Sequence, residues 1–120
     1  MGRLWIALGA LAGLLAVALA ALAAHGLDSI GSARLAMLRS AVQMQGWHAL
    51  ALLFCGLWAP RGGRLADAGG AAFALGLVVF CGAVDALAIG GVSLGLLAPI
   101  GGTLLMAGWA LLLASALRAR

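Results

Sequence analysis

Four long apolar stretches constrain the fold of this chain more than any other feature of its sequence. They cover residues 4–24, 41–59, 68–89 and 94–117. Each is close to the ~20 apolar residues that a helix needs to cross the hydrocarbon core of a bilayer. The first and the fourth contain no ionisable side chain. We therefore predict an all-α fold in which the whole chain, residues 1–120, forms one polytopic transmembrane domain, a bundle of four transmembrane helices.

The composition excludes most soluble classes of protein. Hydrophobic residues make up 66% of the chain and charged residues 8%, whereas a soluble domain is roughly half apolar and a quarter charged. The net charge of +4 does not indicate nucleic-acid binding, because the arginines stand singly or in pairs between apolar runs, without interleaved aromatic residues. Cys55 and Cys81 lie inside apolar runs without CxxC spacing, which favours buried thiols over a metal site or a disulfide.

The connections between the stretches predict the topology. The segment Pro60-Arg61-Gly62-Gly63-Arg64 is typical of a helix end followed by a turn, with Asp67 as the N-cap of the next helix. Four crossings place both termini and this middle connection on one side. That side then holds five arginines, Arg3, Arg61, Arg64, Arg118 and Arg120, and the opposite side holds Arg34 and Arg39. The positive-inside rule therefore predicts that both termini are cytoplasmic.

The first apolar stretch has an alternative interpretation as a secretory signal peptide. Arg3 precedes it, and Ala21-Leu22-Ala23 near its end resembles a cleavage site. The apolar core of a signal peptide is typically ~7–15 residues, and this stretch is longer. The length favours a membrane helix.

Polar side chains within the stretches gather toward the outer end of the predicted bundle. By helical rise, Asp85 lies ~6 Å and His48 ~10 Å from that end. A charge at the bilayer centre costs on the order of 3 kcal/mol, so these groups should face the interior. We predict an outward-facing polar core in which Gln45, His48 and Asp85 converge. The full set of candidates is His25, Gln45, His48, Asp85 and Thr103. Simple hydrogen bonding between helices is the alternative to a functional role.

Proline and glycine predict the packing of the helices. Pro99 with Gly101 and Gly102 should bend the fourth helix in its outer half. The small-residue motifs Gly9-xxx-Gly13 and Gly91-xxx-Gly95 have the spacing that lets membrane helices approach closely, and the first is expected at an interface with another chain.

No pattern in the sequence indicates catalysis or a bound cofactor. His25, His48, Asp85 and Asp28 could ligate a metal only if three helices met there, and no HxxxH spacing places two ligands on one helix. A haem would need two histidines at one depth, yet His25 and His48 are offset by ~10 Å or more. We predict no catalytic residue, no metal and no cofactor.

Three local strings resemble the YgdD family of small inner-membrane proteins. They are AAHGL at residues 23–27, QGWHALAL at residues 45–52, and APIGG at residues 98–102 followed by AGWA at residues 107–110. The resemblance implies a four-span bundle in the bacterial inner membrane. Its motif residues here are His25, Gln45, His48, Pro99, Gly101, Gly102, Gly108 and Trp109. The chain departs from the family pattern after Phe80, where Asp85 stands at the place of an expected tyrosine.

Two functions remain open. The first is a non-enzymatic accessory subunit or scaffold that associates, within the lipid bilayer, with copies of itself or with a larger membrane complex. The alternative is a small-molecule carrier or proton-coupled transporter that uses His48 and Asp85 as its titrating site. Transporters commonly contain repeats and broken helices, and only the Pro99 region here looks broken.

Overall fold

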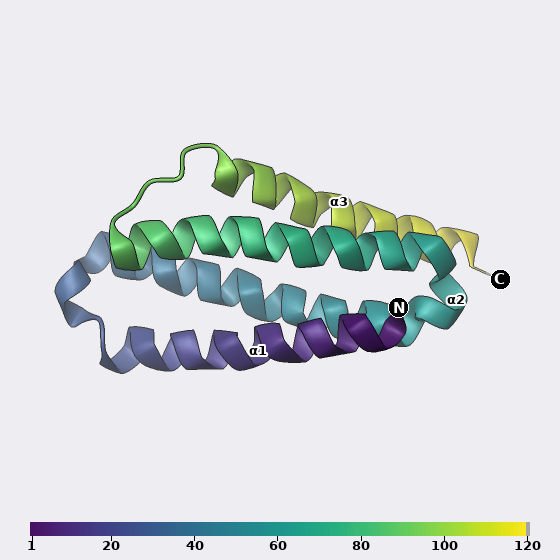
Figure 1. Cartoon of the computed structure of the whole chain (residues 1–120), viewed down its shortest axis with the longest axis horizontal. Helices are drawn as coiled ribbons and strands as arrows, with labels where there is room; N and C mark the ends of the chain where they lie inside the picture. Colours follow the sequence, from purple (N-terminus) through teal and green to yellow (C-terminus); the bar gives the residue numbers. More distant parts are fainter. Residues whose placement is uncertain (120) are drawn as a thin grey trace.

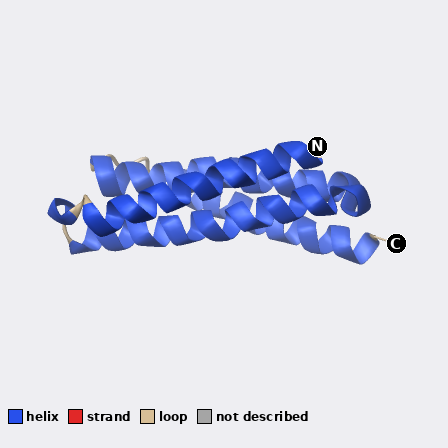
Figure 2. Ribbon diagram, turned by 90° about the horizontal axis from the view of Figure 1, so that it is seen from below, coloured by secondary structure: helices blue, strands red, loops and turns tan. Residues whose placement is uncertain are grey.

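The structure is a computed structural model that describes residues 1–119, apart from the side chain of Asp28. Its elements are α1 (Gly2–His25), the short 3-10 helix η1 (Asp28–Ile30), α2 (Ser32–Gly90) and α3 (Leu97–Arg118). No strand occurs in this part of the chain (Figure 2). The all-α prediction is confirmed, and α1, α2 and α3 are each long and apolar enough to cross a membrane.

The second helix folds back on itself at Gly63. Only this residue departs from helical geometry, with φ 58° and ψ −142°, a region that is essentially restricted to glycine. We call residues 32–62 the first arm and residues 64–90 the second arm. Hydrogen bonds join the arms, including one from Cys81 Sγ to the Ala41 carbonyl at 3.6 Å. In Figure 1 the two arms accordingly run side by side.

This kink replaces the longer turn that the sequence predicted. The chain stays helical through Pro60 and resumes its helix at Arg64, so the break is confined to one residue. Asp67 therefore lies within the second arm and does not cap it. One glycine can reverse the chain here because it adopts a backbone conformation that residues with a Cβ rarely reach.

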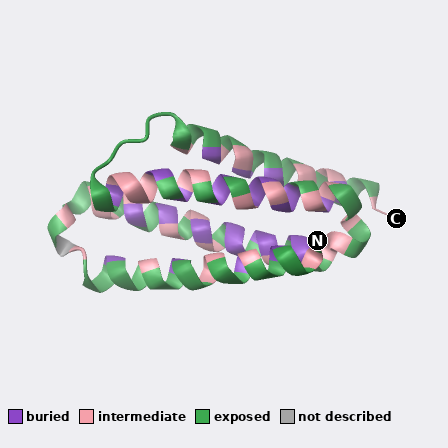
Figure 3. Ribbon diagram, in the orientation of Figure 1, coloured by how far each residue is buried: buried purple, intermediate pink, exposed green. Residues whose placement is uncertain are grey.

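Helices α1 and α3 each pack along α2. The N-terminus, the Gly63 bend and the end of α3 lie at one end of the elongated molecule, and the two other connections lie at the opposite end (Figure 1). We call these the terminal end and the loop end. We call α1, the two arms of α2 and α3 the four rods. Burial is concentrated where the rods face one another, and their outward faces are exposed along their whole length (Figure 3).

Glycines set the distance between neighbouring rods. A Cβ at Gly9 of α1 would lie 2.8 Å from the carbonyl oxygen of Ala49, and one at Gly76 would lie 2.8 Å from Leu105 Cδ2. Gly9-xxx-Gly13 thus packs inside this chain, against the first arm, and the expectation that it faces another chain is wrong. The sequence spacing identified a close helix contact but could not say which helix is the partner.

The connection at residues 91–96 differs from the predicted one. Gly91 and Gly95 have φ values of 69° and 62°, so both serve in turns, and the expected Gly91-xxx-Gly95 helix contact is wrong. Helix α3 begins at Leu97, which places Pro99 in its first turn. A proline there breaks no helical hydrogen bond, so it gives α3 no cause to bend at Pro99. Gly101 instead lets the backbone of Phe80 approach α3, and Gly102 lies near the Phe80 ring.

Candidate functional site

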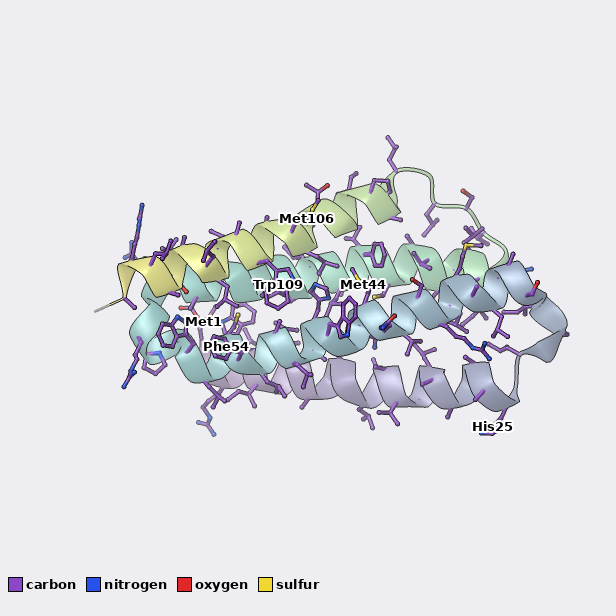
Figure 4. The ribbon with its side chains drawn as sticks, turned by 180° about the vertical axis from the view of Figure 1, so that it is seen from behind. Met1, His25, Met44, Phe54, Met106 and Trp109 are labelled. Carbon is purple, nitrogen blue, oxygen red and sulfur yellow. The ribbon has the colours of Figure 1, made fainter. Side chains whose placement is uncertain are left out.

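The interior is organised around an aromatic cluster at mid-length. His48 of the first arm, Phe73 of the second arm and Trp109 of α3 meet with ring centroids 5.1 to 5.7 Å apart. Figure 4 shows Trp109 between α3 and the first arm. Gly108 makes room for this contact, since a Cβ there would lie 2.6 Å from the Phe73 ring. The cluster therefore joins three of the four rods.

Both ring nitrogens of His48 have partners. Nδ1 lies 2.6 Å from the carbonyl oxygen of Met44, and the indole N–H of Trp109 donates to Nε2 at 2.9 Å. A carbonyl only accepts and an indole N–H only donates, so Nδ1 must carry the proton and Nε2 must be the acceptor. The histidine is 3% exposed. It is thus held as a neutral imidazole with its hydrogen-bonding capacity used.

Gln45 lies one turn before His48 but points to a different neighbour. Its amide Nε2 donates to the carbonyl of Ala12 in α1 at 2.8 Å, and the residue is 7% exposed. Gln45 also lines a cavity of about 390 Å³ between α1 and the second arm. Its hydrogen bond tethers α1 to the first arm.

Asp85 does not reach His48. Its Oδ1 is buried and has no hydrogen-bond partner among the described residues, while His48 is bound elsewhere through both nitrogens. Asp85 lines the same cavity as Gln45. The expected His48 and Asp85 pair is therefore absent, because the two side chains belong to different sites.

The remaining candidates lie outside the interior. His25 is exposed at the end of α1, and Figure 4 shows it pointing away from the bundle. The hydroxyl of exposed Thr103 donates to the carbonyl of Pro99, one turn earlier in α3, at 2.8 Å. The side chain of Asp28, which the sequence indicated, together with His25, as a candidate metal ligand, lies outside the described part. The structure thus brings Gln45 and Asp85 to one cavity and leaves His25, His48 and Thr103 apart from it.

Sequence reasoning missed two polar pairs at the terminal end. The indole N–H of Trp5 in α1 donates to Asp67 Oδ1 at 2.8 Å, and that of Trp58 donates to Ser115 Oγ at 3.0 Å. The sequence suggested that polar contacts are restricted to the outer half of the bundle, and these two pairs show that they are not. Trp5 and Trp58 lie close to Arg3 and Arg61 in the sequence, but nothing in the spacing revealed their acceptors.

Arg34 also has a role that was not predicted. Its guanidinium donates to the carbonyls of Ala88 at 2.9 Å and Ile89 at 3.2 Å. The backbone N–H groups of Gly91 and Val92 donate to the carbonyls of Leu87 and Ala86, respectively. The carbonyls of the last turn of α2 are thus satisfied by a glycine cap and by an arginine from the other arm.

The arrangement offers little chemistry. Among the described side chains, which exclude that of Asp28, no three His, Cys, Asp or Glu stand close enough to hold a metal ion. The neutral His48 has no hydroxyl or thiol to activate, because its Nε2 is bound to an indole. What the interior supplies is a set of hydrogen bonds between rods and one carboxyl group without a protein partner.

Comparison with known proteins identifies the family. A model of the protein family of unknown function DUF423 matches residues 19–102, which include Gln45, His48 and Asp85. The chain belongs to this family. The resemblance to YgdD is confirmed, since the inner membrane protein YgdD of Escherichia coli is 32% identical over 119 residues, covering 97% of this chain and 91% of the relative.

Other relatives have similar lengths. A membrane protein of Haemophilus influenzae is 35% identical over 111 residues, covering 91% of this chain and 90% of its own. The membrane protein YwdK of Bacillus subtilis is 34% identical over 121 residues, covering 97% of this chain and 98% of the relative. No solved structure matches the chain.

Proposed function

We propose that this chain is a multi-pass protein of the bacterial inner membrane that crosses the bilayer four times, with both termini in the cytoplasm. In this topology α1, the two arms of α2 and α3 are the four crossings. The proposal is supported by the length and apolar character of the helices and by the names of relatives, which describe membrane and inner membrane proteins.

Within that membrane we propose a non-enzymatic role as an accessory subunit or scaffold that packs against copies of itself or against a larger complex. The observation that carries this proposal is Trp47. It stands midway along the first arm and is 55% exposed, although tryptophan favours the ends of membrane helices. The other three tryptophans each donate to an acceptor within the bundle, and no such bond is described for Trp47.

Trp47 belongs to an apolar stripe suited to helix contact. Leu50, Phe54 and Leu57 follow it at helical spacing, and each of the four is at least 49% exposed. A second chain packed here would cover the stripe and could accept a hydrogen bond from the indole. The interior also supports this role, because its side-chain hydrogen bonds join the helices to one another.

The test is the mass of the protein after extraction in a mild detergent. We expect assemblies larger than the 11.9 kDa chain, together with cross-linked products in intact membranes. Trp47→Ala should lower the assembled fraction several-fold. The control Leu75→Ala alters a residue of the second arm that is 59% exposed and should leave assembly unchanged. A lone monomer at every concentration, without cross-linked products, would refute the proposal.

The transporter alternative has less support. It needs His48 and Asp85 to exchange a proton or a ligand between them. The described partners of His48 are Met44 and Trp109, and Asp85 faces a different cavity.

A further inference from the structure

A groove runs along one side of the bundle between α1 and the second arm. Leu8 and Leu19 mark its ends on α1, and Ala74 and Asp85 mark them on the second arm. Each pair spans eleven residues, so the groove is ~16 Å long by helical rise. In Figure 1 these two elements lie in front of the first arm, which contributes Gln45 and Leu52 to the floor.

The groove is open sideways along much of its length. Leu11 and Leu15 on its α1 wall are 51% and 49% exposed, and Val78 on the opposite wall is 74% exposed. In the proposed topology this opening faces lipid, so an occupant could enter from the bilayer without crossing water. The inference rests on that part of the proposed function.

The dimensions select a narrow occupant. The cavity holds about 390 Å³. Spread over the ~16 Å of the groove, this volume is a narrow channel, which suits one hydrocarbon chain better than a helix that is at least 10 Å across with its side chains.

The groove has polar groups toward one end and an apolar lining elsewhere, which is the pattern that an amphiphilic molecule would match. Asp85 lies at the loop end, five residues before α2 ends at Gly90, and so ~8 Å from that end of the helix. Because Cys81 pairs with Ala41 in the antiparallel arms, Gln45 lies about eight residues of rise, or ~12 Å, farther down the groove. The remainder of the lining is mostly leucine, alanine and valine.

Asp85 determines what kind of polar group an occupant of the groove should carry. Its Oδ1 is buried without a partner in the described part of the chain, and a carboxylate accepts hydrogen bonds but donates none. Arg34 of the first arm reaches this end of the second arm, but it donates to the Ala88 and Ile89 carbonyls instead. Because Asp85 also lines the groove, an occupant that supplies a positive charge and several N–H donors would compensate this carboxyl group from the groove side, and a primary ammonium group has both.

We propose that this groove binds a single-chain hydrophobic amine from the bilayer. The ammonium group lies against Asp85 near the membrane surface, and the hydrocarbon tail extends along α1 toward Leu8, in the half of the bundle nearer the terminal end. A phospholipid tail could occupy the apolar part alone, but it would gain nothing from the carboxyl group.

The test measures binding of dodecylamine to the full-length protein in lipid nanodiscs, with empty nanodiscs to subtract partitioning into the bilayer. We expect saturable binding of one amine per chain, at least ten-fold tighter than binding of dodecanol, which has the same tail and no charge. Asp85→Asn should remove that preference. Equal affinity for amine and alcohol in the unmodified protein would overturn the proposal and would indicate a lipid-tail site.

A second pair of variants tests the location. Gly82 lines the groove and Gly46 does not, and a Cβ at either position meets nothing within 4 Å. Gly82→Leu should therefore abolish saturable binding by filling the groove, whereas Gly46→Leu should bind like the unmodified protein. Identical binding by both variants would refute the site even if Asp85→Asn failed to fold. A chain that remains monomeric would still bind the amine. Failure of the scaffold proposal can therefore be distinguished from failure of the amine-binding proposal.

Discussion

Individual polar side chains in this protein act mainly as links between rods. His48, Gln45, Trp5 and Trp58 each make a hydrogen bond to a different helix or arm. A hydrogen bond between membrane helices contributes ~0.6–2 kcal/mol, so a few of them matter for a chain with little apolar burial. Asp85 is the exception, because its buried oxygen has no hydrogen-bond partner among the residues that the structure describes.

Removing one indole N–H tests the link at His48. Trp109→Phe keeps an aromatic ring against Phe73 but leaves His48 Nε2 without its donor. We expect a loss of about 1–2 kcal/mol in the free energy of unfolding, because a buried acceptor becomes unsatisfied. Denaturation in sodium dodecyl sulfate followed by circular dichroism measures it. Met106→Leu, at an exposed position of the same helix, should stay near the original value. Equal stability of both variants would show that the hydrogen bond contributes nothing.

The sequence could predict which polar residues are interior but not how they pair. The cost of polar groups in hydrocarbon correctly placed Gln45 and His48 inside, and both are buried. Pairing depends on the rotation of each helix about its axis, which helical rise alone does not determine. That is why Trp109 was found only through a resembling motif, and why Asp85 was assigned to the wrong neighbour.

At the scale of helices, glycine determines both contact and reversal. Gly9 and Gly76 allow rods to touch, whereas Gly63, Gly91 and Gly95 adopt positive φ values in the bend and the turns. The apolar runs predicted where helices form, because a long uncharged stretch permits little else in a bilayer. The boundaries near residues 60–67 and 90–97 were less predictable, since glycine is compatible with either packing or turning.

A single methyl group should separate α1 from the first arm. Gly9→Ala places Cβ 2.8 Å from the Ala49 carbonyl oxygen and 3.0 Å from the Leu53 nitrogen, both of which are backbone atoms. We expect a loss of about 1–3 kcal/mol through overpacking. Gly46→Ala gains the same helix propensity in open space and should be neutral or stabilising. The two variants are compared by thermal unfolding in one detergent, and equal midpoints would contradict the contact.

The arginine cap on α2 gives a second test at this scale. Arg34→Gln shortens the side chain and should free the Ala88 and Ile89 carbonyls, at a cost of about 1–2 kcal/mol. Arg39→Gln removes an exposed arginine from the same arm and should have little effect. Hydrogen exchange should report faster opening of the last turn of α2 in Arg34→Gln alone. Unchanged protection of that turn would mean that the glycine cap suffices.

For the whole molecule, the cap at Arg34 sharpens the charge asymmetry between the two ends. Arg3, Arg61, Arg64 and Arg118 are exposed at the terminal end. At the loop end Arg34 is bound to carbonyls, which leaves Arg39 as the exposed arginine among the described residues. The structure therefore strengthens the physical basis of the proposed orientation, in which the more basic end stays in the cytoplasm.

This orientation predicts which positions a membrane-impermeant maleimide can reach in intact spheroplasts. Ser29→Cys and Ser93→Cys lie in the two connections of the loop end and should be labelled from outside. Arg61→Cys and Ala119→Cys lie at the terminal end and should be labelled only after permeabilisation. The unmodified chain is the control, because its Cys55 and Cys81 are both buried and should remain unlabelled. Labelling of Arg61→Cys from outside together with protection of Ser93→Cys would invert the orientation. Labelling of Ser29→Cys with protection of Ser93→Cys would contradict four crossings, because the fold places both connections at one end of the molecule.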